Sequence, residues 1–340
     1  MAATTRFLLI GAAVLAPCSM TFAQASETEM TCRDVRFTPD VVGVANAELH
    51  AEVCSSRPLV DGMPVQILLH GGAYDNRYWN LPYQPERYSY VLAATREGYV
   101  TVNLDRLGYG NSSRPDGRSL TFEQGAEAVL GVVTAIENGT IGFRPGAIIL
   151  NGHSMGGIVA EHVAGRHERI AALIVSGLAN TPQDQADDSD EDDQNGGPPQ
   201  GEGPPFIPAT ADPRFSAEPW ADGYMTTAPG VRTRLFHAEG TIEPRMVELE
   251  EELTGTLSSA ELSSVMSGGS DRPAFSGPTL YVLGRYDAIA CQGQDCNDRF
   301  AGNDWHLIID GAGHSLNLSL AAPVFFDATF AWLAENNLAP

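Results

Sequence analysis

The feature that most constrains this chain is an apolar run that ends in a serine between two glycines. Residues 148–151 read Ile-Ile-Leu-Asn, and residues 152–156 continue with Gly-His-Ser-Met-Gly. Apolar side chains then recur at helical spacing, among them Ile158 and Val163. A strand, a tight turn and a helix in this order raise a serine hydroxyl above the edge of a sheet. The pattern predicts that Ser154 lies on a strained turn, with the start of a helix directed at any negative charge that forms beside it.

The rest of the chain alternates strand-like and helix-like segments. One helix candidate opens with a capping box formed by Thr121 and Gln124. Such alternation predicts an α/β fold with a mostly parallel, doubly wound sheet that helices cover on both faces. Strands are expected at residues 64–70, 99–104, 148–151, 170–175, 279–283 and 305–309, with edge strands at 35–37 and 48–53. Helices are expected at 88–96, at 121–137, directly after Ser154, and from Pro323 onward.

Residues 179–275 interrupt this alternation. Within them, residues 182–205 are acidic and rich in proline and glycine, so they hold too little apolar surface to offset the entropy of ordering, and we expect disorder. We interpret 179–275 as a lid insertion between a first core part at 26–178 and a second at 276–340. The insertion also contains a helical apolar pattern, with glutamates on the other face, at Ile242, Met246, Leu249 and Leu253.

Residues 1–25 are typical of a signal peptide. Arg6 precedes an apolar segment, Phe7 to Leu15, that is too short to span a bilayer, and residues 23–25 form an Ala-Gln-Ala cleavage site. Cleavage there predicts a secreted or periplasmic protein without integral membrane association. Residues 15–18 are similar to a lipoprotein box, but the proline before Cys18 fits that motif poorly.

Removal of the signal peptide leaves an even number of cysteines. They are Cys32, Cys54, Cys291 and Cys296. In an exported chain this indicates two disulfides, for which three pairings are possible. Proximity in sequence favours Cys32 with Cys54 and Cys291 with Cys296. A zinc site is the competing interpretation, but the Cys-x4-Cys spacing has no second matching pair.

The charge of the chain limits its partners. The formal net charge is -23 at pH 7, and the chain contains no lysine. Because such a surface repels nucleic acid and anionic lipid, we expect neither as a partner. Repulsion between acidic side chains also keeps an exported protein soluble in salty or acidic surroundings. An acidic loop together with GC-rich coding bias would produce the same net charge.

Three distant residues have the side chains that nucleophilic catalysis needs. A serine hydroxyl is a weak nucleophile, so it needs a base, and the base needs an orienting group. Ser154, Asp287 and His314 occur in this order, each after a strand-like run. The same strand ends carry the motifs His70-Gly71-Gly72, Asp105-Arg106-Leu107-Gly108-Tyr109-Gly110, Gly152 to Gly156, Gly284 to Asp287 and Gly311 to His314. With these motifs the chain resembles a lid-containing serine hydrolase of the α/β-hydrolase superfamily, esterase- or lipase-like, over essentially all of the mature sequence except the acidic loop.

The resemblance implies a catalytic triad. Ser154 would attack an acyl carbon, His314 would take its proton and deliver it to the leaving group, and Asp287 would orient the imidazole. The backbone N–H groups of Met155 and Gly72 would form the oxyanion hole, with Ala73 as the alternative to Gly72.

Other polar residues near these motifs have structural roles in this interpretation. The counterpart of Asp105 in the family braces the loop that crosses the site, and Asp310 need not face the His314 ring. His70 is expected to shape the oxyanion loop, and His153 to pack behind the serine. A disulfide between Cys291 and Cys296 would stiffen the loop that bears Asp287. No cluster of histidines and carboxylates has metal-ligand spacing, so we expect neither a metal nor a cofactor.

The leading hypothesis is an exported serine hydrolase that cleaves a small-molecule carboxylic ester through an acyl-enzyme. Serine at the turn argues against dehalogenases and epoxide hydrolases, which use a carboxylate there, and export argues against carbon–carbon bond hydrolases. An aminopeptidase, amidase or lactonase with the same triad is the second hypothesis. A binding protein that keeps the fold without turnover is the third. The sequence does not specify the acyl group, the alcohol or the oligomeric state.

Overall fold

The fold is built on one large, twisted sheet. The computed structural model describes residues 29–179, 204–267, 272–300 and 305–340, and its sheet has eight strands in the order β1-β2-β4-β3-β5-β6-β10-β11. Strand β2 runs antiparallel to both of its neighbours, and the other neighbouring pairs are parallel. The predicted α/β class is therefore confirmed. The strands are β1 (Thr31–Phe37), β2 (Leu49–Ser55), β3 (Val65–Leu69), β4 (Val100–Leu104), β5 (Ile148–His153), β6 (Ile170–Ser176), β10 (Thr279–Gly284) and β11 (Trp305–Ile309).

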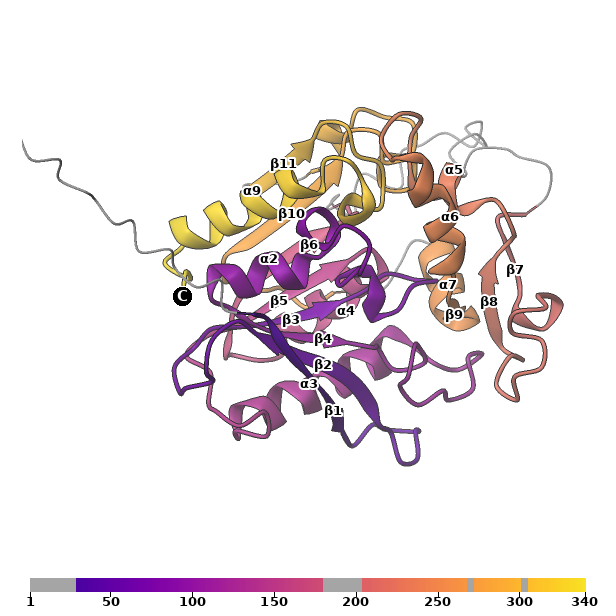
Figure 1. The fold of residues 1–340 in the computed structure, drawn as a ribbon. Coiled ribbons are helices and arrows are strands. Elements are labelled where there is room, and N and C mark those ends of the chain that lie inside the picture. The colour runs from indigo at the N-terminus through magenta and orange to yellow at the C-terminus, as the bar shows by residue number, and fades with distance from the viewer. Residues whose placement is uncertain (1–28, 180–203, 268–271, 301–304) are drawn as a thin grey trace, which may run out of the picture.

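Helices cover both faces of the sheet (Figure 1). One apolar cluster joins Ile67 of β3 to α3 (Phe122–Glu137) and α4 (Met155–Ala164). A second cluster joins the next residue, Leu68, to α2 (Tyr90–Glu97) and α9 (Ala322–Glu335) on the opposite face. Because successive side chains of a strand point to opposite faces, a sheet covered on both sides needs unbroken apolar strands. All five residues of β3 are buried accordingly.

One helix expectation is confirmed and one strand expectation was wrong. The helix expected at 88–96 is α2, which begins at Tyr90 because Ser89 has an extended backbone and its side chain accepts from the N–H of Leu92; a short helix, α1 (Pro85–Tyr88), precedes it. The second predicted edge strand, β2, lies inside the sheet, between β1 and β4. Only β1 is an edge there, and the disulfide between Cys32 and Cys54 ties it to β2. The expected capping box opens α3.

The described part of the insertion forms a small layer of its own. A three-stranded antiparallel sheet contains β7 (Phe206–Pro208), β8 (Tyr224–Thr227) and β9 (Thr256–Ser258). It is accompanied by α5 (Arg232–Phe236), α6 (Pro244–Glu252) and α7 (Ser259–Met266). Figure 1 shows these elements gathered at one end of the large sheet, in orange tones. The helical pattern was predicted, but the small sheet was not.

Two of the regions predicted from sequence fall outside the described residues. These are the signal peptide at 1–25 and nearly all of the acidic segment at 182–205. Within the part of the chain that the structure does describe, no helix is long and apolar enough to cross a membrane. The remaining short helices are α8 (Ala288–Cys291) and the 3₁₀ turns η1 (Asn76–Tyr78), η3 (Ala209–Ala211), η4 (Cys296–Arg299) and η5 (Leu316–Leu318).

Glycine permits the close approach of β3, β5 and α4. A Cβ atom on Gly156 would lie 2.3 Å from the carbonyl oxygen of Leu69 and 2.4 Å from that of His70. A Cβ atom on Gly152 would lie 2.5 Å from the carbonyl oxygen of Gly156. These contacts are with backbone atoms of central elements, which cannot move aside without disturbing the sheet.

Gly156→Ala is therefore expected to lower the free energy of unfolding by about 3 kcal/mol, because overpacking against backbone cannot relax through a rotamer change. Urea denaturation measures the loss. Gly125→Ala in α3 is the matched control, since its Cβ atom would meet Val159 Cγ2 at 3.4 Å, an ordinary contact. The control should be neutral or slightly stabilising, and equal losses in both variants would contradict the packing argument.

Candidate active site

Ser154 occupies a strained turn between β5 and α4. Its φ is 52° and its ψ is -123°, a region that residues with a side chain rarely adopt. The turn is held by hydrogen bonds from the N–H of Ser154 to the carbonyl of Ser176 at 2.7 Å and from the N–H of Gly157 to the carbonyl of Ser154 at 2.8 Å. Ser154 is half-buried, whereas its neighbours on both sides are buried. The turn therefore presents the hydroxyl at the edge of the sheet.

The structure brings Asp287 and His314 to the same place. His314 lies in the loop after β11, and its Nε2 atom is 3.0 Å from Ser154 Oγ. Its Nδ1 atom is 3.0 Å from both carboxylate oxygens of Asp287, which follows β10. An ionised carboxylate only accepts hydrogen bonds, so Nδ1 carries the proton and Nε2 is left to accept from the serine hydroxyl. The arrangement can move a proton from Ser154 to the imidazole.

The Asp287 carboxylate is itself held in place. It caps α8 by accepting from the N–H groups of Ile289 at 3.0 Å and Ala290 at 2.9 Å. Asp287 and His314 are only 1% and 3% exposed. Both side chains are therefore shielded from water that would compete for their hydrogen bond.

Gly72 and Met155 lie beside the serine. A Cβ atom on Gly72 would be 2.3 Å from Met155 Sδ, so the two residues are in direct contact. Gly72, Met155 and Ser154 line the same cavity, whereas the alternative oxyanion residue, Ala73, is fully buried and does not line it. Of Gly72 and Ala73, only Gly72 therefore contributes to the space beside Ser154.

The cavity beside Ser154 has a volume of about 420 Å³ and is lined mostly by apolar side chains. Among the described residues, the titratable groups in its wall are His314, Tyr74 and the buried His153. The insertion, which the sequence analysis interpreted as a lid, supplies most of the apolar wall. These residues are Phe206, Leu235, Phe236, Leu257, Leu262, Val265 and Met266.

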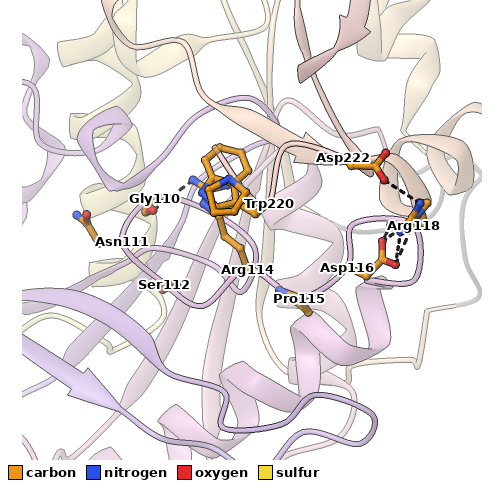
Figure 2. Close-up of a pocket in the computed structure, with 10 residues that line it drawn as sticks. Gly110, Asn111, Ser112, Arg114, Pro115, Asp116, Arg118, Trp220 and Asp222 are labelled. Atoms are coloured by element: carbon orange, nitrogen blue, oxygen red, sulfur yellow. Dashed lines mark hydrogen bonds and ion pairs between the residues drawn. The ribbon is translucent and has the colours of Figure 1, made fainter. Parts of the chain in front are cut away.

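A second hollow, of about 730 Å³, shares no lining residue with the first, and Figure 2 shows the residues that line it. Its charged groups are already paired, because Arg118 contacts Asp116 at 2.9 Å and Asp222 at 3.0 Å. The guanidinium of Arg114 lies 3.8 Å from the centre of the Trp220 ring and donates to the carbonyl of Gly108. None of the three triad candidates lines this hollow. The cavity at Ser154 is therefore the candidate site.

Two buried histidines, His153 in the cavity wall and His70 beside it, have lowered pKa values. Burial and the neighbouring His314 ring hold the pKa of His153 well below its usual 6.5, and its ring stacks on Tyr78 at 4.6 Å. Burial likewise lowers the pKa of His70 to about 4. His70 Nδ1 donates to the carbonyl of Gly71 at 2.8 Å, while Nε2 accepts from the N–H of Arg106 at 3.2 Å. His70 thus joins the loop after β3 to the loop after β4.

Asp310 and Asp105, the other two aspartates near the sequence motifs, have partners other than the His314 imidazole. Asp310 is exposed and pairs with Arg285. Asp105 is fully buried and accepts from the N–H groups of Asn76 and Asn111, each at 2.9 Å. It also contacts His50 Nδ1 at 2.9 Å. Asp105 therefore braces two loops, the role expected of it.

The contact with Asp105 predicts a pH effect on stability. The hydrogen bond to Asp105 raises the pKa of His50 above 6.5, with help from Asp34 and against the effect of burial. A raised folded-state pKa stabilises the fold fully below pH 6.5, and this stabilisation is lost as the pH rises through the folded-state value. Urea unfolding from pH 6 to 9 should show the wild-type protein losing stability relative to His50→Gln. A constant difference between the two proteins would contradict the prediction.

The disulfide between Cys291 and Cys296 lies directly beyond Asp287. Cys291 is the last residue of α8, the helix that Asp287 caps, and the bridge spans a sequence separation of 5 residues. The bridge thus holds the far end of the short helix that fixes the Asp287 carboxylate.

Replacement of both Cys291 and Cys296 by serine should lower kcat about tenfold while the fold persists, because a small displacement of Asp287 misdirects the imidazole. Substrate turnover and circular dichroism measure the two effects. The pair Cys32→Ser and Cys54→Ser is the control: that bridge spans 22 residues and should cost about 3 kcal/mol of stability without changing kcat. The idea fails if the two double variants lose activity equally.

Comparisons with known proteins agree with this fold. Residues 66–328 match the profile of the alpha/beta hydrolase family. No curated protein matches the chain. Among solved structures, a bromoperoxidase from Bacillus anthracis is 18% identical with a TM-score of 0.59, covering 89% of this chain and 100% of its own. An esterase from Exiguobacterium antarcticum is 17% identical with a TM-score of 0.55, covering 88% of this chain and 99% of its own. At such identities the likeness shows a shared fold and leaves the substrate open.

Proposed function

The chain belongs to the alpha/beta hydrolase family, and from that premise we propose that it hydrolyses carboxylic esters through an acyl-enzyme formed on Ser154. The family implies hydrolase activity. The observation that carries the finer proposal is the pair of contacts made by His314, with Ser154 Oγ on one side and Asp287 on the other, each at 3.0 Å. These contacts lie at the wall of an apolar cavity that an ester can enter.

The first half-reaction forms the acyl-enzyme. Ser154 Oγ attacks the carbonyl carbon while His314 Nε2 takes its proton, and Asp287 stabilises the imidazolium that results. The N–H groups of Met155 and Gly72 bind the oxyanion of the tetrahedral intermediate. His314 then protonates the leaving alkoxide. In the second half-reaction a water molecule loses its proton to His314, attacks the acyl carbon and releases the acid, with Ser154 regenerated.

The cavity wall favours an uncharged acyl group. Among the described residues that line it, no carboxylate or arginine is present to bind a charged substrate. An aminopeptidase needs an acidic group to bind the free amine of its substrate, so this wall fits an aminopeptidase poorly. Apolar area is stabilised by burial at about 25 cal/mol per Å², so affinity should increase with acyl length until the cavity is full.

We also propose that the protein is exported and acts outside the cytoplasm. The two disulfides are compatible with an oxidising compartment, and residues 1–25 have the sequence pattern of a signal peptide. In the same proposal, residues 179–275 form a lid whose described part covers Ser154.

A panel of nitrophenyl esters of graded acyl length tests the proposal. The wild-type protein should turn over neutral esters, with kcat/KM rising and then falling with chain length. Ser154→Ala should lower kcat by about 10⁴-fold or more, because it removes the nucleophile. A fluorophosphonate probe should label the wild-type protein but not this variant.

Ser119→Ala, a change at an exposed serine, is the control and should keep both activity and labelling. Faster hydrolysis of matched amides or lactones than of esters would identify one of the alternative activities. Absence of both turnover and labelling would instead indicate a binding protein.

A further inference from the structure

A buried ion pair in the insertion contacts the loops that bear Gly72 and His314, outside the cavity itself. Arg232 of α5 donates from Nε to Glu250 Oε2 of α6 at 3.0 Å, and both side chains are 0% exposed. The sequence pattern placed the glutamates of α6 on the outer face, but Glu250 lies on the buried face, one turn after Met246. A buried ion pair is weak evidence for stability, since desolvation offsets much of the attraction. The contacts of this ion pair with two loops of the core offer another reason for its presence.

The first set of contacts reaches the loop that bears Gly72. Arg232 Nη1 donates to the carbonyl oxygen of Ala73 at 2.9 Å, and the N–H of Gly255 donates to the same oxygen at 2.9 Å. Ala73 has a φ of 57°, a conformation that costs energy for a residue with a side chain. The Arg232 guanidinium also lies 4.3 Å from the centre of the Tyr74 ring. The insertion thus fixes the carbonyl that follows Gly72 and holds a strained residue in place.

The second set of contacts reaches the loop that bears His314. The Tyr74 hydroxyl donates to Glu250 Oε1 at 2.8 Å, and it lies 2.8 Å from Ser315 Oγ. Because a tyrosine has a single hydroxyl proton, Ser315 is the donor in the second contact. The N–H of Ser315 also donates to the carbonyl of Phe236 at 3.0 Å, and the Phe236 ring stacks 5.8 Å from the ring of His314.

The Glu250 carboxylate stays charged in this setting. Burial alone would raise its pKa, but Arg232 and His237 outweigh burial and lower the pKa to about 2. His237 contributes a hydrogen bond from Nε2 at 2.5 Å. The Glu250 carboxylate therefore connects α5 and α6 to the loop of Tyr74 and, through the Tyr74 hydroxyl, to the loop of His314.

We propose that Arg232 and Glu250 are positioning residues. They hold the loop of Gly72 and the loop of His314 in the relative position that ester hydrolysis requires. This inference depends on the proposed function, because it requires that Gly72 and His314 act on the same substrate. The insertion then completes the catalytic apparatus in addition to supplying the apolar wall. Neither residue touches the cavity, so both act through Ala73, Tyr74 and Ser315.

A second buried ion pair provides the matched control. Arg106 contacts Glu261 of α7 at 3.1 Å, both side chains are 1% exposed, and a tyrosine, Tyr109, again donates to the carboxylate. This pair also joins the insertion to the core. Its side chains contact neither Ala73 nor Ser315 in the described residues. A purely structural role predicts the same behaviour for both pairs, whereas a positioning role predicts a difference.

The experiment compares Glu250→Gln with Glu261→Gln in the full-length protein. Both variants should lose stability in thermal unfolding. Only Glu250→Gln should lower kcat for a nitrophenyl ester, by about 10- to 100-fold, with KM within about twofold of wild type, because misalignment affects the transition state more than binding. Long incubation with a fluorophosphonate counts competent sites, so kcat is expressed per folded site.

A double variant tests the connection through Tyr74. Tyr74→Phe keeps the ring and removes the hydroxyl that joins Glu250 to Ser315, so it should lower kcat severalfold on its own. In Glu250→Gln combined with Tyr74→Phe, the loss should be no larger than in Glu250→Gln alone, since groups that act as a unit are not additive. Where Glu250→Gln does not fold, Tyr74→Phe against Glu261→Gln makes the same comparison.

The outcomes separate the two proposals. A wild-type protein without esterase activity would overturn the proposed function. An active wild-type protein whose Glu250→Gln and Tyr74→Phe variants keep full kcat per site would overturn the positioning role alone. The positioning role is likewise overturned if Glu261→Gln loses as much kcat as Glu250→Gln, or if the losses of the double variant simply multiply.

Discussion

One strained turn determines where the Ser154 hydroxyl stands at the edge of the sheet. Ser154 has a φ of 52°, a conformation that costs about 1–3 kcal/mol. It persists because β5 and α4 are locked against β3, and this locking requires glycine at 152 and 156. In return, the hydroxyl projects from the sheet edge next to the N–H groups at the start of α4. Every other group at the candidate site has to come to this point.

The parallel sheet explains how distant residues reach it. The carboxyl ends of β5, β10 and β11 lie at the same edge because these strands run in the same direction. His314 can therefore contact Ser154 although 160 positions separate them. Asp287 follows β10 and is held as the cap of α8, so contacts other than the imidazole also fix its direction. The sheet brings the groups together, and local caps orient them.

The insertion surrounds this edge of the sheet with apolar side chains, unlike the acidic composition of the protein as a whole. The protein as a whole is strongly acidic, with a formal charge of -23, yet the wall around Ser154 is apolar and built mostly from insertion residues. Behind that wall, the insertion places charged residues such as Arg232 and Glu250 where no water reaches them. Apolar side chains toward the substrate and paired charges toward the loops are compatible because the charges satisfy one another.

The sequence by itself determined the α/β class, most strand positions, the capped start of α3 and the three residues that meet at the cavity. These follow from local signals, since periodicity, caps and turn glycines act within a few residues of chain. Tertiary structure alone decided that β2 lies inside the sheet, that Gly72 and not Ala73 lines the cavity, and that Glu250 is buried. The physical reason is that a glutamate or an edge-like strand has the same local pattern in either setting, and only the partners that pack against it determine whether it meets water.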